Sequence, residues 1–121
     1  MQRFLLFACA LGLTSACGDK VCTQEYYPAV QVTVMDSLTG ARREKGATLL
    51  IRYTMEGRVW SDAHLGVRDS VPISGGDVGL NHLTVMRDGY VPWSQSVFVQ
   101  GIGHCQRPRL VGVLARLQRA G

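Results

Sequence analysis

Apolar and polar residues alternate one by one in several short stretches of this 121-residue chain. Successive side chains of a β-strand point to opposite faces, so a period of two is typical of strands with one buried face. A shorter strand is expected around 59–61, and the alternating stretches lie at 30–34, 47–54, 81–86, 97–99 and 111–113. Six or seven short strands without long helical periodicity predict an all-β fold, an antiparallel β-sandwich of about seven strands.

Turn-forming residues separate the predicted strands. Residues 36–40 form a turn cluster, Glu56-Gly57 fits a hairpin turn, and Ser74-Gly75-Gly76-Asp77 marks a further break. Near the end of the chain, the last strand could give way to a turn over residues 114–119. In one predicted strand, Leu83 and Val85 are expected to alternate with Asn81, His82, Thr84 and Met86.

Length and composition describe one globular domain. Hydrophobic residues make up 46% of the chain and charged residues 18%, which excludes a disordered protein. Beyond the N-terminal segment, no stretch approaches eighteen unbroken apolar residues, so a polytopic membrane protein is also excluded. The formal net charge of +4 includes Arg3, and the longest basic run is Arg42-Arg43. So few and scattered charges exclude a nucleic-acid partner.

The N-terminus has the order of a bacterial secretory signal. Arg3 precedes an apolar stretch from Phe4 to Leu13, and the small residues Thr14, Ser15 and Ala16 follow. The apolar stretch is short for a membrane span. We therefore predict a signal peptide over residues 1–16, which leaves 121 − 16 = 105 residues in the exported protein.

The segment Leu13-Thr14-Ser15-Ala16-Cys17 resembles the lipobox of bacterial lipoproteins, although that family prefers Leu where this chain has Thr14. The resemblance implies that Cys17 becomes the acylated N-terminus and that the partner of this segment is a membrane. Ordinary cleavage after Ala16 is the alternative. Gly18 stands where a retained inner-membrane lipoprotein carries Asp, which favours the outer membrane. Residues 17–27 are then the lipid attachment and short tether, and 28–121 the β-sandwich domain.

Four cysteines predict one disulfide bond. Cys9 lies in the signal segment and Cys17 carries the lipid, so Cys22 and Cys105 remain as an even pair in an oxidising compartment. Two unrelated buried thiols are the alternative. The two cysteines precede the first and the last predicted strands, so they meet at one end of the sandwich if those strands run parallel. A zinc site is not expected, because neither cysteine has a second ligand at the usual spacing.

Two strings resemble the carboxypeptidase regulatory-like domains. Val-Gln-Val-Thr-Val-Met-Asp-Ser-Leu-Thr-Gly, at 30–40, is similar to their first strand, which runs into an Asp-x-x-Thr-Gly turn. Leu-Thr-Val-Met-Arg-Asp-Gly-Tyr, at 83–90, is similar to their second signature. The resemblance covers about residues 22–117 and implies a transthyretin-like sandwich of seven strands. Many exported members also pair an early cysteine with one before the last strand, as Cys22 and Cys105 are placed.

The residues of these strings have structural roles by their chemistry. Asp36 is expected to accept backbone hydrogen bonds across its turn, and Gly40 to take a positive φ. Gly89 allows a tight reversal, after which Tyr90 is expected to lay its ring on the edge of the sandwich with its hydroxyl in water.

The residue patterns of common enzymes are not found. His64, His82 and His104 stand on separate segments, so a shared metal site is not expected. The chain lacks the Gly-x-Ser-x-Gly of serine hydrolases and the Gly-Lys-Ser/Thr of phosphate loops. Its end, Leu-Gln-Arg-Ala-Gly, differs from the Tyr-Arg-Gly-Ser of the transthyretin-related hydrolases. Two pairs of acids, Asp62 with Asp69 and Asp77 with Asp88, could act together only if the fold joined them. They are better explained as solvated turn residues. We expect neither catalysis nor a cofactor.

Aromatic side chains are the remaining candidates for ligand binding. Trp60, Tyr90 and Trp93 could form a platform on which sugar rings stack, while burial of both tryptophans against the core is the alternative.

The leading hypothesis for the function is a non-catalytic, lipid-anchored module of the cell envelope that acts through structural or protein contacts. The second hypothesis is a carbohydrate-binding module that uses these aromatic residues.

Overall fold

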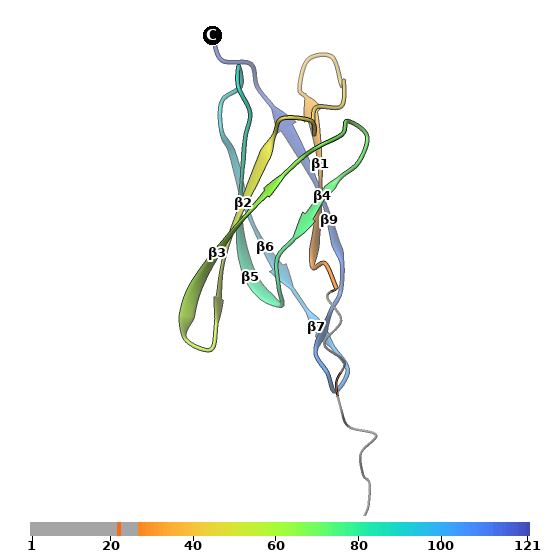
Figure 1. Cartoon of the computed structure of the whole chain (residues 1–121), viewed down its shortest axis with the longest axis vertical. Helices are drawn as coiled ribbons and strands as arrows, with labels where there is room; N and C mark the ends of the chain where they lie inside the picture. Colours follow the sequence, from red (N-terminus) through yellow and green to blue (C-terminus); the bar gives the residue numbers. More distant parts are fainter. Residues whose placement is uncertain (1–21, 23–26) are drawn as a thin grey trace, which may run out of the picture.

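The computed structural model describes residue 22 and residues 27–121, which fold as a β-sandwich. Within this described part the chain contains no helix, so none that is long and apolar enough to cross a bilayer. The described residues form nine strands, which are β1 (Val30–Asp36), β2 (Thr48–Met55), β3 (Arg58–Leu65), β4 (Ile73–Gly75), β5 (Gly79–Met86), β6 (Trp93–Val99), β7 (Gly101–Ile102), β8 (Arg107–Pro108) and β9 (Val111–Leu117). Figure 1 shows how they are arranged. The predicted all-β fold is confirmed.

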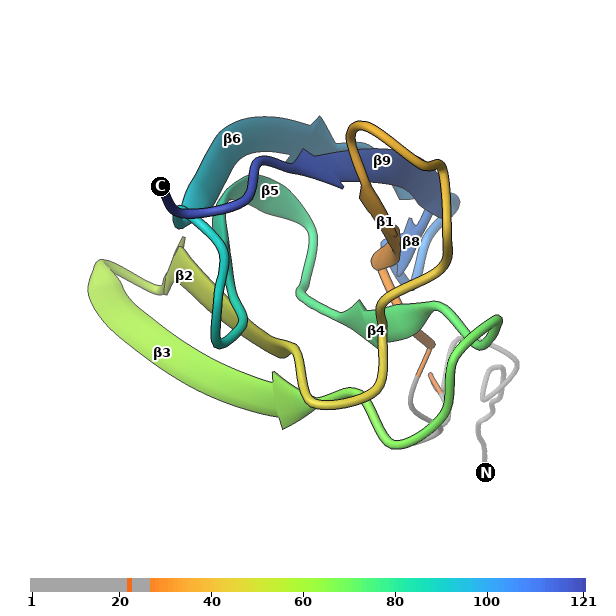
Figure 2. The ribbon, with the colours of Figure 1, turned by 90° about the horizontal axis from the view of Figure 1, so that it is seen from above.

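Two sheets face each other across the core. One has the strand order β3-β2-β5-β6 and the other β4-β1-β9, while β7 and β8 pair as a small hairpin. Figure 2 shows β6 lying alongside β9, where the two sheets come together at one edge. Near this edge the amide of Val91 donates to the carbonyl of Gln118 at 2.8 Å. The seven strands of the two larger sheets in the described part match the predicted number.

The four-stranded sheet is antiparallel throughout. Its β2–β3 hairpin turns through Glu56 and Gly57, whose φ values are 53° and 75°. Positive φ at both central residues suits the right-handed twist of the two strands, so the predicted hairpin turn is confirmed.

The three-stranded sheet is mixed. β1 pairs antiparallel with β4 but parallel with β9, in register from Val30 opposite Val111 to Asp36 opposite Leu117. The sandwich is therefore antiparallel except for this pair, whose parallel course is the condition stated above for the two cysteines to meet. The chain leaves β6, passes through the β7–β8 hairpin and enters β9 at the end where β1 also begins. Both strands consequently start at the same end of the molecule.

Alternating side chains fill the space between the sheets. The largest apolar side chains that are fully buried are Leu49, Ile51, Leu83 and Leu117, and valines of β1, β5 and β6 complete the core. The alternation predicted for 30–34 and 47–54 agrees with the burial of these strands. Each such side chain contributes about 1.5–3 kcal/mol through the apolar surface it removes from water.

The structure corrects three local expectations. The break expected at Ser74-Gly75-Gly76-Asp77 begins only after Gly75, because β4 spans Ile73–Gly75. Only glycine fits at position 75, since a Cβ there would lie 2.6 Å from Nε2 of His64. The last strand continues to Leu117 instead of turning at 114–119, because it pairs with β1 along its whole length. Asn81 faces inward and is fully buried. Its amide donates to the carbonyls of Asp77 and Gly79 at 2.7 and 2.9 Å, so it closes the turn before β5 from inside.

Candidate functional site

A disulfide bond fastens the N-terminal lead to the sandwich. Cys22 and Cys105 are bonded with their Cα atoms 5.5 Å apart, within the usual range for disulfides. Cys105 lies between β7 and β8, at the end of the molecule where β1 and β9 begin. The predicted bond is therefore confirmed, as is the parallel arrangement on which its geometry depended. Cys17, the predicted lipid attachment residue, lies outside the described residues.

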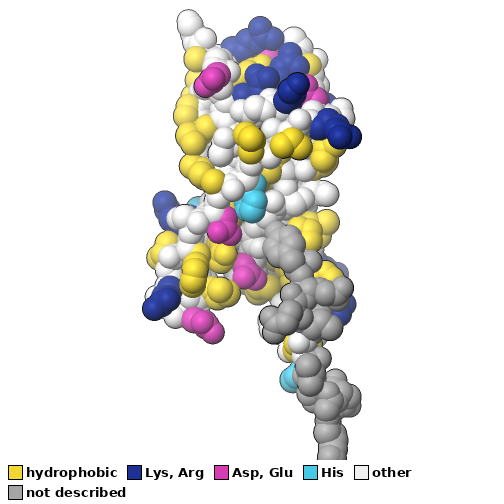
Figure 3. Space-filling view, in the orientation of Figure 1, with side chains coloured by type: hydrophobic (Ala, Val, Ile, Leu, Met, Phe, Trp, Pro, Cys, Tyr) yellow, Lys and Arg dark blue, Asp and Glu magenta, His cyan; other side chains and the backbone are white. Residues whose placement is uncertain are grey.

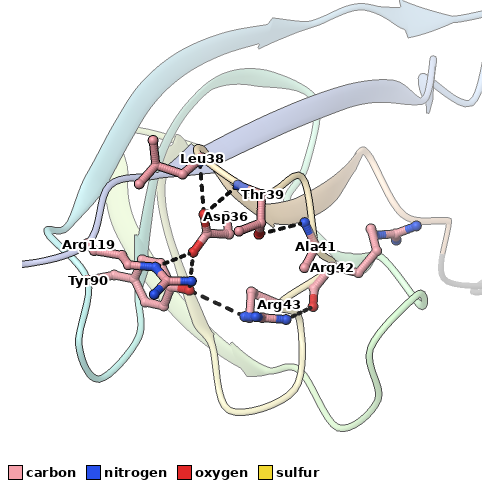
Figure 4. Close-up of polar contacts among 8 residues, drawn as sticks. All are labelled: Asp36, Leu38, Thr39, Ala41, Arg42, Arg43, Tyr90 and Arg119. Atoms are coloured by element: carbon pink, nitrogen blue, oxygen red, sulfur yellow. Dashed lines mark hydrogen bonds and ion pairs between the residues drawn. The ribbon is translucent and has the colours of Figure 1, made fainter.

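A buried carboxylate organises the opposite end, where β1 finishes. Oδ1 of Asp36 accepts hydrogen bonds from the amides of Leu38 and Thr39 at 2.8 and 3.0 Å, as the sequence predicts. Oδ2 accepts from the hydroxyl of Tyr90 and from Nε of Arg119, each at 2.7 Å. Figure 4 shows the carboxylate between its own turn and these two side chains. One acid thus joins the end of β1 to the β5–β6 connection and to the segment after β9.

These hydrogen bonds keep the Asp36–Arg119 pair charged. The amide of Thr39, followed by Tyr90 and Arg119, holds the pKa of Asp36 far below its usual range. The hydrogen bond to Asp36 in turn raises the pKa of Arg119. The carboxylate has no exposed surface, so its four donors replace the water it loses on folding.

Tyr90 differs from the sequence-based expectation. Its ring packs partly against the core, but its hydroxyl is not left to water, because it donates to Asp36 and accepts from Nε of Arg43 at 3.3 Å. The guanidinium carbon of Arg87 lies 5.6 Å from the centre of its ring, within the range of a cation–π interaction. Sequence reasoning missed the partners of the hydroxyl because Asp36 and Arg43 lie 54 and 47 residues from Tyr90 in the chain.

A second buried acid, Glu44, was not expected at all. Its Oε2 accepts from Arg42, in an ion pair, and from the amide of Val34 at 3.0 Å. Its Oε1 accepts from the amide of Ser70 at 2.9 Å. Burial raises the pKa of Glu44, but the hydrogen bonds from Arg42, Val34 and Ser70 together lower it below its usual value. In the sequence this residue is one acid in the charged run Arg-Arg-Glu-Lys, which is typical of a solvated loop.

The structure does not bring the two tryptophans together. Trp60 lies on β3 and Trp93 on β6, the opposite edge strands of the four-stranded sheet. Trp93 packs partly against the core, beside a shallow hollow of about 240 Å³ that Arg116 also lines. Trp60 is 41% exposed and stands directly opposite Tyr53, whose hydroxyl donates to Asp62 at 3.1 Å. The two indoles therefore stand at opposite edges of the sheet, and Trp60 is the more exposed of the two.

The histidines and the acids considered for catalysis are dispersed. His82 is exposed on its strand, as expected, and its Nδ1 lies 2.7 Å from Oγ of Ser96. Nε2 of His64 is buried without a hydrogen-bond partner in the described part of the chain. Asp62 accepts from Tyr53, whereas Asp69 accepts from the amide of Lys45. The described residues contain no group of three or more potential metal ligands.

No protein-family model matches the sequence, and no curated protein matches it. The function is therefore inferred from the residues and geometry of this chain.

Proposed function

We propose that this protein is an exported, lipid-anchored β-sandwich module of the bacterial cell envelope, related to the carboxypeptidase regulatory-like domains. In this proposal it acts through contacts with another envelope protein rather than through catalysis. The observation that carries the proposal is the Cys22–Cys105 disulfide bond. Such a bond persists in an oxidising compartment, which agrees with the secretory signal expected at the N-terminus.

The position of this bond determines how an anchored domain would be presented. Cys17 precedes Cys22 by five residues, which span at most about 18 Å when extended. An acylated Cys17 would therefore hold the disulfide end close to the membrane, in our proposal the outer membrane. The loops β1–β2, β3–β4 and β5–β6 lie at the other end. Strands of seven residues place these loops about 23 Å farther out, where they are free to contact a partner.

The anchor is tested by exporting the full chain with and without Cys17→Ser. We expect the wild type in the membrane fraction, extractable by detergent, with an acylated N-terminal Cys17 detected by mass spectrometry. Cys17→Ser is expected to release the protein or to stop its processing, while Cys9→Ser, which removes another N-terminal cysteine, leaves anchoring unchanged. A soluble wild type that begins with unmodified Cys17 would show ordinary cleavage after Ala16 instead.

Protein contact is tested by photo-crosslinking in the cell. Leu38 is 83% exposed in the β1–β2 loop, and Val59 is exposed near the β2–β3 turn at the other end of its sheet. With a photoreactive residue at either position, we expect a discrete crosslinked product from position 38 and little from position 59. Equal, diffuse labelling from both positions would argue against contact through the loop end.

Carbohydrate binding at Trp60 is the second candidate. Its exposed indole stands beside Tyr53 and the carboxylate of Asp62, and sugars are recognised by such a stacking face with polar groups next to it. The test is pull-down on peptidoglycan and a panel of glycans. We expect Trp60→Ala to abolish binding and Trp93→Ala, on the far edge strand, to retain it. No binding by the wild type would remove this candidate.

A further inference from the structure

Three arginines from separate segments gather around Tyr90. Nε of Arg43 donates to the Tyr90 hydroxyl at 3.3 Å, and the guanidinium of Arg87 lies over the ring, 5.6 Å from its centre. Nε of Arg119 donates to Oδ2 of Asp36, the same oxygen that the Tyr90 hydroxyl reaches. These residues belong to the β1–β2 connection, the β5–β6 connection and the segment after β9. We call Arg43, Arg87 and Arg119 the arginine cluster.

The charge of the arginine cluster is only partly balanced. Among the described residues, Asp36 is the one carboxylate that forms an ion pair with any of the three arginines, so the local sum is 3 − 1 = +2. Glu44 is bound by Arg42 and by backbone amides. Asp69 accepts from the backbone of Lys45, and Asp88, exposed in the β5–β6 connection, forms no ion pair in the described part. Figure 3 shows Lys and Arg side chains gathered at this end of the molecule.

Hydrogen bonds to backbone carbonyls hold two of the three guanidinium groups in place. Nη1 of Arg43 donates to the carbonyl of Arg42 at 3.0 Å, and Nε of Arg87 donates to the carbonyl of Lys45 at 3.0 Å. The terminal nitrogens of Arg87 and Arg119 meet no carboxylate besides Asp36 within the described chain, and the Arg119 side chain is 54% exposed. A guanidinium fixed in this way loses little further freedom when its remaining N–H groups bind a ligand.

We propose that the arginine cluster binds the phosphate group of a phosphomonoester. Such a group carries a charge of about −1.5 to −2 at pH 7, close to the +2 left by the cluster, whereas one carboxylate carries only −1. Its three oxygens also match the paired donors of several guanidinium groups. The phosphomonoester could belong to a soluble phosphorylated sugar or to a lipid headgroup. This inference rests on the described residues alone and does not depend on the anchor or on a protein partner.

The test is a titration of the full chain, purified in a neutral detergent, with glucose 6-phosphate. We expect saturable shifts of the arginine Nε–H signals by NMR and a rise in melting temperature, because a ligand that binds only the folded state stabilises it. Glucose, and sodium chloride at the same ionic strength, are expected to produce neither effect. Mixed micelles that contain phosphatidic acid provide the lipid arm. A response to the sugar phosphate assigns a soluble source, and a response to the micelles alone assigns a headgroup.

Arg87→Gln is the informative variant, because Arg87 does not touch the buried carboxylate. We expect it to weaken binding at least tenfold, with Arg87→Lys intermediate because the charge stays and the paired donors are lost. Arg58→Gln removes the same charge near the β2–β3 turn and is expected to change affinity less than twofold. If the Arg87→Gln variant does not fold, the affinities of Arg87→Lys and Arg58→Lys are compared in its place. Absence of saturable binding in both arms, or an equal effect of the changes at 87 and 58, would overturn the proposal.

Discussion

The two ends of the sandwich are held together by different chemistry. At the end where β1 and β9 begin, a single covalent bond joins Cys22 to the β7–β8 hairpin. At the other end, the buried carboxylates of Asp36 and Glu44 collect hydrogen bonds from several loops. A disulfide stabilises mainly by restricting the unfolded chain, whereas a polar network stabilises only while its groups are charged and in place. The first end should therefore be indifferent to pH and ligands, and the second should respond to both.

Packing at the carboxylate end gives the largest expected effect. A Cβ added at Gly66 would overlap the carbonyl oxygen of Glu44, which is backbone and cannot move aside, and would also meet Ile73 at 3.0 Å. We expect Gly66→Ala to lower the free energy of unfolding by about 4 kcal/mol or more, the upper range for single substitutions. Chemical denaturation measures this. Gly112→Ala, in β9 with open space around the added Cβ, is the matched control and should stay within about 0.5 kcal/mol of wild type.

Removing the disulfide should have the next largest effect. The bond closes a loop over 83 positions of sequence, and its loss in Cys22→Ser/Cys105→Ser is expected to cost about 3 kcal/mol. The protein should still fold, because the core between the two large sheets does not include either cysteine. Circular dichroism and denaturation of the double variant test both statements. A double variant that is unfolded in buffer would show that the disulfide end depends on the bond for its structure.

Neutralising Asp36 should have a moderate effect. Asp36→Asn keeps an oxygen for the amides of Leu38 and Thr39 but removes the charge that faces Arg119. We expect the melting temperature to fall by about 4–8 °C. The change should be larger than in Asp69→Asn, where the acid is exposed and accepts from a single backbone amide. Equal changes in the two variants would mean that the buried network adds little to stability.

Acid should weaken the carboxylate end and spare the disulfide. The pKa values of Asp36 and Glu44 lie below their ordinary values of 3.8 and 4.5 in the folded protein. The unfolded state therefore takes up protons first, so this stabilisation is complete above about pH 5 and is lost as the pH falls through the lowered values. Melting temperatures between pH 7 and 2 measure it. The decline should be shallower in Asp36→Asn and unchanged in slope when the two cysteines are replaced.

Alternation and cysteine counting predicted what depends on local pattern. A period of two indicates which face of a strand is buried, and an even pair of exported cysteines indicates a bond, so the sandwich and Cys22–Cys105 could both be anticipated. The polar contacts could not, because their partners are far apart in the chain. Asp36 and Arg119 are 83 residues apart, and Glu44 is indistinguishable in the sequence from a solvated loop acid. Tyr90 was placed correctly at the edge, but its hydroxyl partner lies 54 residues away.

The smallest expected effect on stability comes from substituting one glycine at each end of the sandwich. Gly40 and Gly103 have nearly equal φ values of 73° and 75°, and a Cβ at either would meet nothing within 4 Å. Alanine at either position should therefore lower the free energy of unfolding by about 1 kcal/mol, from backbone strain alone.

The disulfide should make the two glycines differ. Gly103 stands two residues before Cys105, in a connection that the disulfide holds in place. Without the bond this connection can relax, so the cost of Gly103→Ala should shrink when Cys22 and Cys105 are replaced by serine. The cost of Gly40→Ala, at the carboxylate end, should not change. Denaturant unfolding of the four combinations measures the coupling. Equal costs in both backgrounds at both glycines would show that the disulfide does not constrain the backbone around it.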